Sequence, residues 1–155
     1  RLAGRRSEVV PGSELVEPLC ALAAGAGVSV ALVGSTEEVL AQAAQRLEAA
    51  HSGLRVVTRI APPFGFDPEE PDVAEIADQL NQDDAGLCFL ALGAPKQERL
   101  AMRLQEAVPR CGVVSVGAGI DFIAGHQARA PLWVRKIAME WLWRLLGNPA
   151  RLAAR

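Results

Sequence analysis

The sequence predicts an α/β fold with a Rossmann-like, mostly parallel sheet, helices on both faces and an amphipathic helix near the carboxyl end. Three observations lead to this prediction. Short apolar runs of strand length alternate with stretches of helical length. The runs are almost continuously apolar, which is typical of strands covered on both faces. Two of them end in glycine-bearing turns that carry polar side chains. Such alternation implies βαβ crossovers and a parallel sheet.

The elements follow in chain order. The strands are expected at 28–33, 54–60, 87–92 and 113–116, and the helices at about 13–24, 37–50, 71–81 and 96–107. The one long loop signal is Ala61-Pro-Pro-Phe-Gly-Phe-Asp-Pro68, which follows the second strand. It should therefore overhang the edge of the sheet where such folds bind ligands, although a stiff connector explains it equally well.

Length and composition allow one domain with a real core. The chain has 155 residues, half of them hydrophobic, yet no run reaches the roughly 18 uninterrupted apolar residues of a membrane-spanning helix. No signal-peptide pattern opens it. Cys20, Cys88 and Cys111 stand singly in apolar surroundings, as reduced core thiols of a cytosolic protein would. His51 and His126 form no ligand motif, so no metal is predicted.

Charge is distributed unevenly along the chain. The net charge is −2, but residues 1–6 carry three arginines and residues 129–155 carry six basic residues against one acid. Residues 7–128 hold 7 basic and 17 acidic residues. Basic ends on an acidic body favour a specific anionic partner for those ends. Nucleic acid is not expected, because the body would be repelled by phosphate and no recognition motif is present.

The stretch Cys88-Phe-Leu-Ala-Leu-Gly-Ala-Pro-Lys-Gln-Glu-Arg99 carries the strongest functional signal. An apolar strand meets a Gly-x-Pro turn, and charged and amide side chains then open a helix. In a parallel sheet this junction lies at the carboxyl end of a strand, where helix-end N–H groups attract anions. Lys96, Gln97 and Glu98 would project into a site there. A strand–turn–helix with a solvated first turn fits the same spacing.

A second segment repeats this pattern. In Gly112-Val-Val-Ser-Val-Gly-Ala-Gly-Ile-Asp-Phe-Ile-Ala-Gly125 a β-branched run ends in small residues, and a carboxylate follows at Asp121. Gly117 and Gly119 would let the backbone approach a ligand or take positive φ. Asp121 would face the same site, or else serve as an ordinary N-cap of a short helix.

The basic tail differs from the rest of the chain. Residues 131–146 form a helix candidate that holds all three tryptophans, and basic side chains are interleaved with them. This composition suits the headgroup layer of an anionic membrane, but docking on the chain's own domain or an oligomer contact explains it as well. We therefore divide the chain into an α/β core, 1–128, and a basic helical appendage, 129–155.

Two common classes of nucleotide-binding enzyme are excluded. A dinucleotide-binding dehydrogenase needs G-x-G-x-x-G after its first strand, and Val33-Gly-Ser-Thr-Glu-Glu38 lacks it. The turn at Gly117 fails as well, because Phe122 takes the third glycine position. The Gly-Lys-Ser/Thr sequence of a P-loop is absent.

Seven ordered segments resemble signature segments of the WecG/TagA/CpsF glycosyltransferases. They are Pro11-Gly-Ser-Glu-Leu15, Pro62-Pro-Phe-Gly65, Gly93-Ala-Pro-Lys-Gln-Glu98, Val116-Gly-Ala-Gly-Ile-Asp-Phe-Ile-Ala-Gly125, Arg129-Ala-Pro131, Glu140-Trp-Leu-Trp-Arg-Leu145 and Asn148-Pro-Ala-Arg-Leu152. The resemblance runs from near Arg1 to Arg155 in the family's order.

The resemblance implies an inverting transfer of an N-acetylhexosamine-type sugar, with N-acetylmannosamine or its uronate expected. The donor would be a UDP-sugar and the acceptor a polyprenyl-diphosphate-linked sugar in cell-surface polysaccharide or teichoic acid synthesis. It implies a cytoplasmic enzyme held peripherally at the inner face of the plasma membrane, without a cofactor. A homo-oligomer is compatible with it.

The resemblance also indicates site residues. Gln97 matches the family's functional glutamine, and we place it with Asp121 as the catalytic candidates. Substrate contacts are expected at Gly34, Gly65, Gly93, Pro95, Lys96, Gln97, Glu98, Gly117, Gly119 and Asp121. Contacts with the acceptor diphosphate or the membrane are expected at Arg129, Arg135, Arg144, Arg151, Trp133 and Trp141, since arginine binds phosphate through a bidentate fork.

The chain departs from the family's pattern at its start. The family's proposed catalytic base is the aspartate of an Asp-Gly motif upstream of the segment that Arg1-Leu-Ala-Gly-Arg-Arg6 resembles. This motif does not occur in the sequence, so we expect an amino-terminally incomplete protein that turns over poorly. Asp121 and Glu98 are the remaining acidic candidates for the base. The alternative is a non-catalytic membrane-docking or scaffolding module derived from such an enzyme.

Overall fold

A computed structural model of the chain describes residues 11–69 and 71–125. Within them lies one parallel sheet of four strands, in the order β2-β1-β3-β4. The strands are β1 (Val30–Gly34), β2 (Val56–Ile60), β3 (Leu87–Ala91) and β4 (Gly112–Ser115). The predicted α/β class with a parallel sheet is confirmed, and each strand begins within two residues of its expected start.

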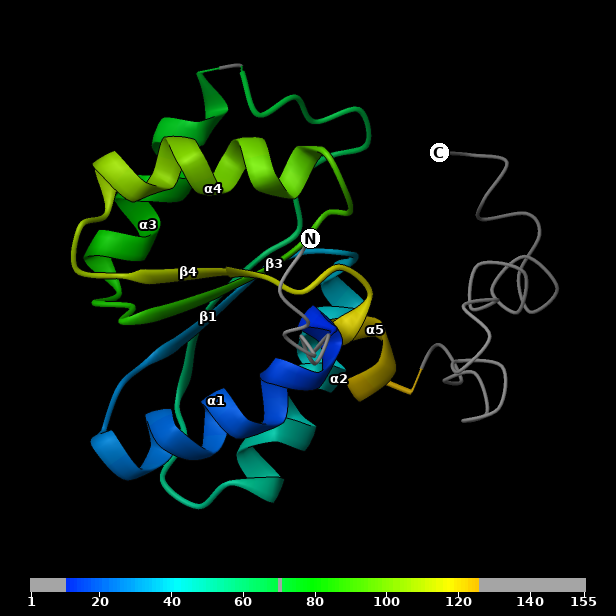
Figure 1. Cartoon of the computed structure of the whole chain (residues 1–155), viewed down its shortest axis with the longest axis vertical. Helices are drawn as coiled ribbons and strands as arrows, with labels where there is room; N and C mark the ends of the chain where they lie inside the picture. The colour runs from blue at the N-terminus through cyan, green and yellow to red at the C-terminus, as the bar shows by residue number, and fades with distance from the viewer. Residues whose placement is uncertain (1–10, 70, 126–155) are drawn as a thin grey trace, which may run out of the picture.

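Helices cover both faces of the sheet (Figure 1). The helices are α1 (Gly12–Ala26), α2 (Glu37–Ala50), α3 (Asp72–Gln82), α4 (Lys96–Ala107) and α5 (Gly119–Ile123). One apolar cluster joins α1, α2 and α5 to one face, and a second joins α3 and α4 to the other. The side chains of β1 alternate between the two clusters, with Leu32 in the first and Val33 in the second. This alternation follows from the two-residue period of a strand.

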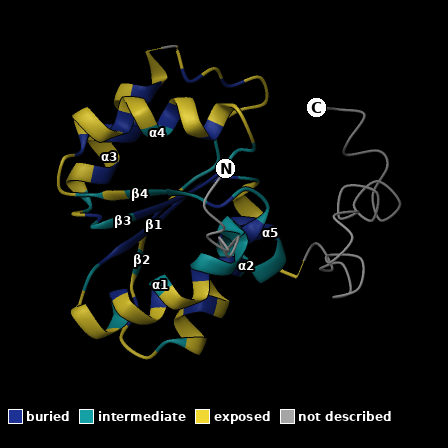
Figure 2. Cartoon of the chain, viewed as in Figure 1, coloured by how far each residue is buried: buried dark blue, intermediate teal, exposed yellow. Residues whose placement is uncertain are grey.

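The two inner strands differ from the two edge strands in burial (Figure 2). Every residue of β1 is buried, and β3 is buried except at its first residue. In β2 only Thr58 is buried, and β4 has no fully buried residue. The expectation that all strands are covered on both sides is therefore wrong for the edges. An edge strand has one neighbour, so solvent reaches its side chains from the open flank.

The three cysteines are free thiols, as predicted. Cys20 and Cys88 are buried, and Cys111 is partly buried. Burial disfavours the thiolate, so it raises the pKa of Cys20 to about 12 and that of Cys111 to about 11. The pKa of Cys88 is raised as well, for the same reason. Thiols of this kind are protonated at neutral pH and act as small apolar side chains.

No helix among the described residues is long and apolar enough to cross a bilayer. The expected helix over 131–146 and the division between core and appendage lie outside the described residues.

Candidate functional site

The loops that follow the four strands all lie at one end of the sheet, because the strands are parallel. We call this set the carboxyl edge; it comprises residues 35–36, 61–66, 92–95 and 116–118. The chain runs from β1 outward to β2 and then returns to β3 on the other side of β1. The strand order therefore reverses between β1 and β3. Ligands of open α/β sheets bind at such a reversal.

The backbones of β1 and β3 come very close at this reversal. A Cβ built on Gly34 would stand 2.6 Å from the carbonyl carbon of Ala91, and Gly34 has φ of 118°. Ser35 follows with φ of 55°, and its N–H donates to the Ala91 oxygen at 3.3 Å. The predicted importance of Gly34 thus has a structural cause: only glycine fits between the two strand ends.

The turn after β3 leads directly into α4. Gly93 has φ of 79°, the Ala94–Pro95 peptide is cis, and α4 begins at Lys96. Lys96 is an exposed residue, and its ammonium donates to the carbonyl oxygen of Phe66 at 2.9 Å. The long loop after β2 is therefore tied to the first turn of α4. A lysine and a helix N-terminus together attract anions.

Gln97 links the loops after β3 and β4. Its side chain is 8% exposed, and its Oε1 accepts the backbone N–H of Gly117 at 3.1 Å. Its Nε2 donates to Oε1 of Glu98 at 2.8 Å. The prediction that the two glycine-bearing strand ends face one another is confirmed by this contact. Gly117 also adopts a positive φ, of 54°, as expected.

Asp121 lies in helix α5, which follows β4, and contacts the turn after β1. It is 2% exposed, and its Oδ1 accepts the Ser35 hydroxyl at 3.1 Å. The suggestion that Asp121 is an N-cap is wrong, because α5 begins at Gly119 and Asp121 lies inside its first turn. Gly119 itself packs against α1, where an added Cβ would stand 3.0 Å from the Cα of Ser13. Gly119 thus serves the packing between α5 and α1.

The structure brings most of the predicted residues to the carboxyl edge. Gly34 is the last residue of β1. The loops and first helical turns that follow β3 and β4 carry Gly93, Pro95, Lys96, Gln97, Glu98, Gly117 and Asp121. Gly65 lies on the loop after β2, with φ of 86°. Arg129, Trp133, Arg135, Trp141, Arg144 and Arg151 lie outside the described residues. In the described part of the chain no group of His, Cys, Asp or Glu could hold a metal ion.

Sequence reasoning missed Ser35 as the partner of Asp121. The two residues are 86 positions apart, so no local pattern could pair them. A usable signal was present, because a serine directly after a strand-ending glycine stands where a polar side chain reaches this edge. The sequence analysis also did not single out Asp72 and Glu75 in the first turn of α3, which line a cavity, because their pattern is that of an ordinary solvated helix face.

Replacing Gln97 with leucine should lower the free energy of unfolding by about 1–3 kcal/mol, because the partly buried Gly117 N–H would lose its acceptor. Urea denaturation measures this. Gln105→Leu is the matched control, since Gln105 is exposed on the same helix. It should stay within about 0.5 kcal/mol of the parent protein. Equal effects of the two changes would show that the Gln97–Gly117 contact does not stabilise the fold.

The chain matches one known family along its whole length. All 155 residues match the profile of the glycosyl transferase WecG/TagA/CpsF family. The match spans the loops that carry Lys96, Gln97 and Asp121. A parallel sheet with polar groups and a lysine at its carboxyl edge is an architecture suited to a nucleotide ligand. The chain belongs to the glycosyl transferase WecG/TagA/CpsF family.

Proposed function

We propose that this chain forms the donor site of an inverting glycosyltransferase. The enzyme would move an N-acetylhexosamine-type sugar, N-acetylmannosamine or its uronate, from a UDP-sugar to a polyprenyl-diphosphate-linked acceptor. The product would serve cell-surface polysaccharide or teichoic acid synthesis at the inner face of the plasma membrane. Family membership supports sugar transfer, and the carboxyl edge supports a nucleotide donor.

The observation that carries the proposal is the placement of Lys96. When the bond between sugar and UDP breaks, negative charge builds on the leaving diphosphate. A lysine and the N-terminus of α4 on the same loop stabilise that charge. Because Lys96 is held by the Phe66 carbonyl, it is already in position before the donor arrives. Preorganised charges of this kind cost little rearrangement during the reaction.

Gln97 and Asp121 would support the reaction indirectly, by holding the loops of the site in position. Gln97 holds the Gly117 loop against α4, and Asp121 holds the turn at Ser35. Both side chains are nearly buried, which favours positioning over proton transfer. Glu98 is exposed, and its carboxylate is oriented by the Gln97 amide. Glu98 is therefore better placed than Asp121 to contact a substrate hydroxyl.

The basic segment 129–155 would serve the acceptor side. Arg129, Arg135, Arg144 and Arg151 would bind the acceptor diphosphate or anionic headgroups, and Trp133 and Trp141 would enter the interface. The described body of the chain is acidic and would be repelled by an anionic surface. This asymmetry supports membrane contact through the basic segment.

Substituting Lys96 with methionine is expected to weaken UDP binding about tenfold or more, since a charge-assisted contact with the diphosphate is lost while the aliphatic stem remains. Isothermal titration calorimetry with UDP measures this change. Arg99→Met is the control, because Arg99 is an exposed cation one turn further along α4.

Two outcomes would contradict the donor site. If the parent chain bound no UDP, the non-catalytic docking module would be the better account. If Lys96→Met and Arg99→Met weakened UDP equally, the diphosphate would be attracted only by overall charge. Transfer of a labelled N-acetylhexosamine to a polyprenyl-diphosphate sugar then tests the reaction itself.

A further inference from the structure

We propose that the cavity between the end of β2 and helix α3 holds the nucleoside half of the donor. The ribose hydroxyls would donate to Asp72 and Glu75, and the base would lie against Phe66 and Pro62. This inference rests on the proposed function and adds the subsite and its recognition groups.

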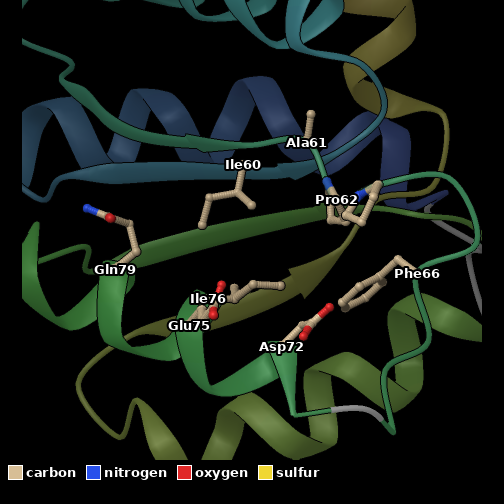
Figure 3. Close-up of a pocket in the computed structure, with 9 residues that line it drawn as sticks. Ile60, Ala61, Pro62, Phe66, Asp72, Glu75, Ile76 and Gln79 are labelled. Carbon is tan, nitrogen blue, oxygen red and sulfur yellow. The ribbon is translucent and has the colours of Figure 1, made fainter.

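The cavity has a suitable size and position. Its volume is about 390 Å³, within the range of small-molecule pockets. The lining residues come from the end of β2, the loop after it and one side of α3; they are Ile60, Ala61, Pro62, Pro63, Phe66, Asp72, Glu75, Ile76 and Gln79. Figure 3 shows Phe66 and Asp72 at the end of the cavity nearer the loop, and Gln79 at the other end. The cavity therefore opens beside the carboxyl edge.

The chemistry of the lining excludes a phosphate and favours hydroxyl groups. No lining residue is a cation, and two are carboxylates. Neither Asp72 nor Glu75 has an ion-pair or side-chain hydrogen-bond partner among residues 11–69 and 71–125. Nearby acids are already engaged: Glu69 pairs with Arg103 at 3.4 Å, and Asp83 accepts the Thr58 hydroxyl at 2.7 Å. An ionised carboxylate only accepts hydrogen bonds, so a sugar diol is a fitting partner.

Phe66 joins this cavity to the anion-attracting part of the carboxyl edge. Its side chain lines the cavity and is 5% exposed, while its carbonyl oxygen accepts the Lys96 ammonium at 2.9 Å. A diphosphate at Lys96 would thus have immediately beside it a cavity that is partly apolar and carries two carboxylates. A nucleoside diphosphate has this same sequence of parts, with a polyanion joined to a ribose and a flat base.

The base, rather than the transferred sugar, fits the cavity better. The cavity is lined by an aromatic ring together with proline and isoleucine side chains, and such a lining suits a planar base. The cavity also lies at the edge strand β2, whereas Gln97 and Asp121 follow β3 and β4. The sugar that reacts would lie on that other side of Lys96, over the loops that these two residues hold.

The test measures binding of four ligands to a double variant, Asp72→Asn with Glu75→Gln. The ligands are UDP, 2′,3′-dideoxy-UDP, inorganic pyrophosphate and UDP-N-acetylhexosamine. We expect the double variant to bind UDP about tenfold or more weakly, since two charge-assisted contacts with hydroxyls are lost. Binding of dideoxy-UDP and of pyrophosphate should be unchanged or slightly tighter, because negative charge has been removed. Asp78→Asn is the control, as Asp78 is exposed on the same helix but does not line the cavity.

The outcomes separate this inference from the function on which it rests. If the parent chain binds no UDP, both the proposed donor site and the nucleoside cavity are overturned. If it binds UDP and the double variant binds UDP equally or more tightly, the cavity is not the ribose site, but the donor site at Lys96 stands. A parallel loss of pyrophosphate binding would also overturn the inference, because pyrophosphate has no hydroxyl for Asp72 or Glu75. Weaker binding of UDP-N-acetylhexosamine, with UDP unaffected, would assign the cavity to the transferred sugar and overturn it too.

Discussion

Replacing Gly34 with alanine is expected to lower the free energy of unfolding by about 3–5 kcal/mol, enough to unfold a large share of a marginally stable domain. The new Cβ would stand 2.6 Å and 2.7 Å from the carbonyl carbon and oxygen of Ala91. These are backbone atoms of the neighbouring inner strand, so they cannot rotate away as a flexible side chain would. Relief requires β1 and β3 to separate at the place where their ends carry the site.

The control for this change is Gly27→Ala. Gly27 also has a positive φ, of 67°, but nothing lies within 4 Å of its added Cβ. Gly27→Ala should therefore lower the free energy of unfolding only by the cost of holding an alanine in the left-handed conformation, about 1–2 kcal/mol. Urea denaturation of both variants separates the clash from the backbone strain. Similar losses at the two positions would show that β1 and β3 do not meet as closely as described.

Phe66→Ala is expected to cost about 3–5 kcal/mol of unfolding free energy, because Phe66 is buried in the cluster beneath α3 and α4. Phe64 is the natural control, since it lies two residues away in the same loop and is 95% exposed. Phe64→Ala should change the stability by less than about 0.5 kcal/mol. Thermal or urea unfolding measures both. A costly Phe64→Ala would mean that the loop packs differently from the arrangement described here.

Phe66 also allows the stability effect to be separated from the binding effect. Phe66→Leu keeps an apolar side chain in the cluster and removes only the flat ring. We expect most of the stability to return with leucine, while the affinity for UDP stays reduced if the ring contacts the base. Recovery of both properties would show that the position needs only apolar volume.

Local sequence patterns predicted the helices and strands well, because the apolar residues of each element recur at the spacing of a helix or a strand. Helix α2 was expected at 37–50 and α4 at 96–107, and both have those bounds in the structure. Their apolar positions recur at helical spacing, and a glycine or proline marks the turn before each. The glycine-bearing turns after β3 and β4 were recognisable for the same reason. Strand burial was predicted less well, because burial depends on a strand's place in the sheet.

The order of the strands could not be read from the chain. No local sequence pattern predicts that β3 pairs with β1 and that β2 is an edge strand. That choice decides which loops meet, and it brings Gln97 to Gly117 and Ser35 to Asp121. Each of these contacts joins residues that are at least 20 positions apart. Their partners are chosen by the packing of the whole sheet.

The sequence by itself determined the α/β class, the bounds of the main helices, the polar turn that carries Lys96 and Gln97, and the family resemblance. Short-range sterics and hydrophobic periodicity are sufficient for these. Only the tertiary structure decided that Asp121 is buried against Ser35, that Lys96 holds the loop after β2, and that Asp72 and Glu75 line a cavity. Those features depend on which backbone segments come together, and burial and close contact arise only when the sheet has formed.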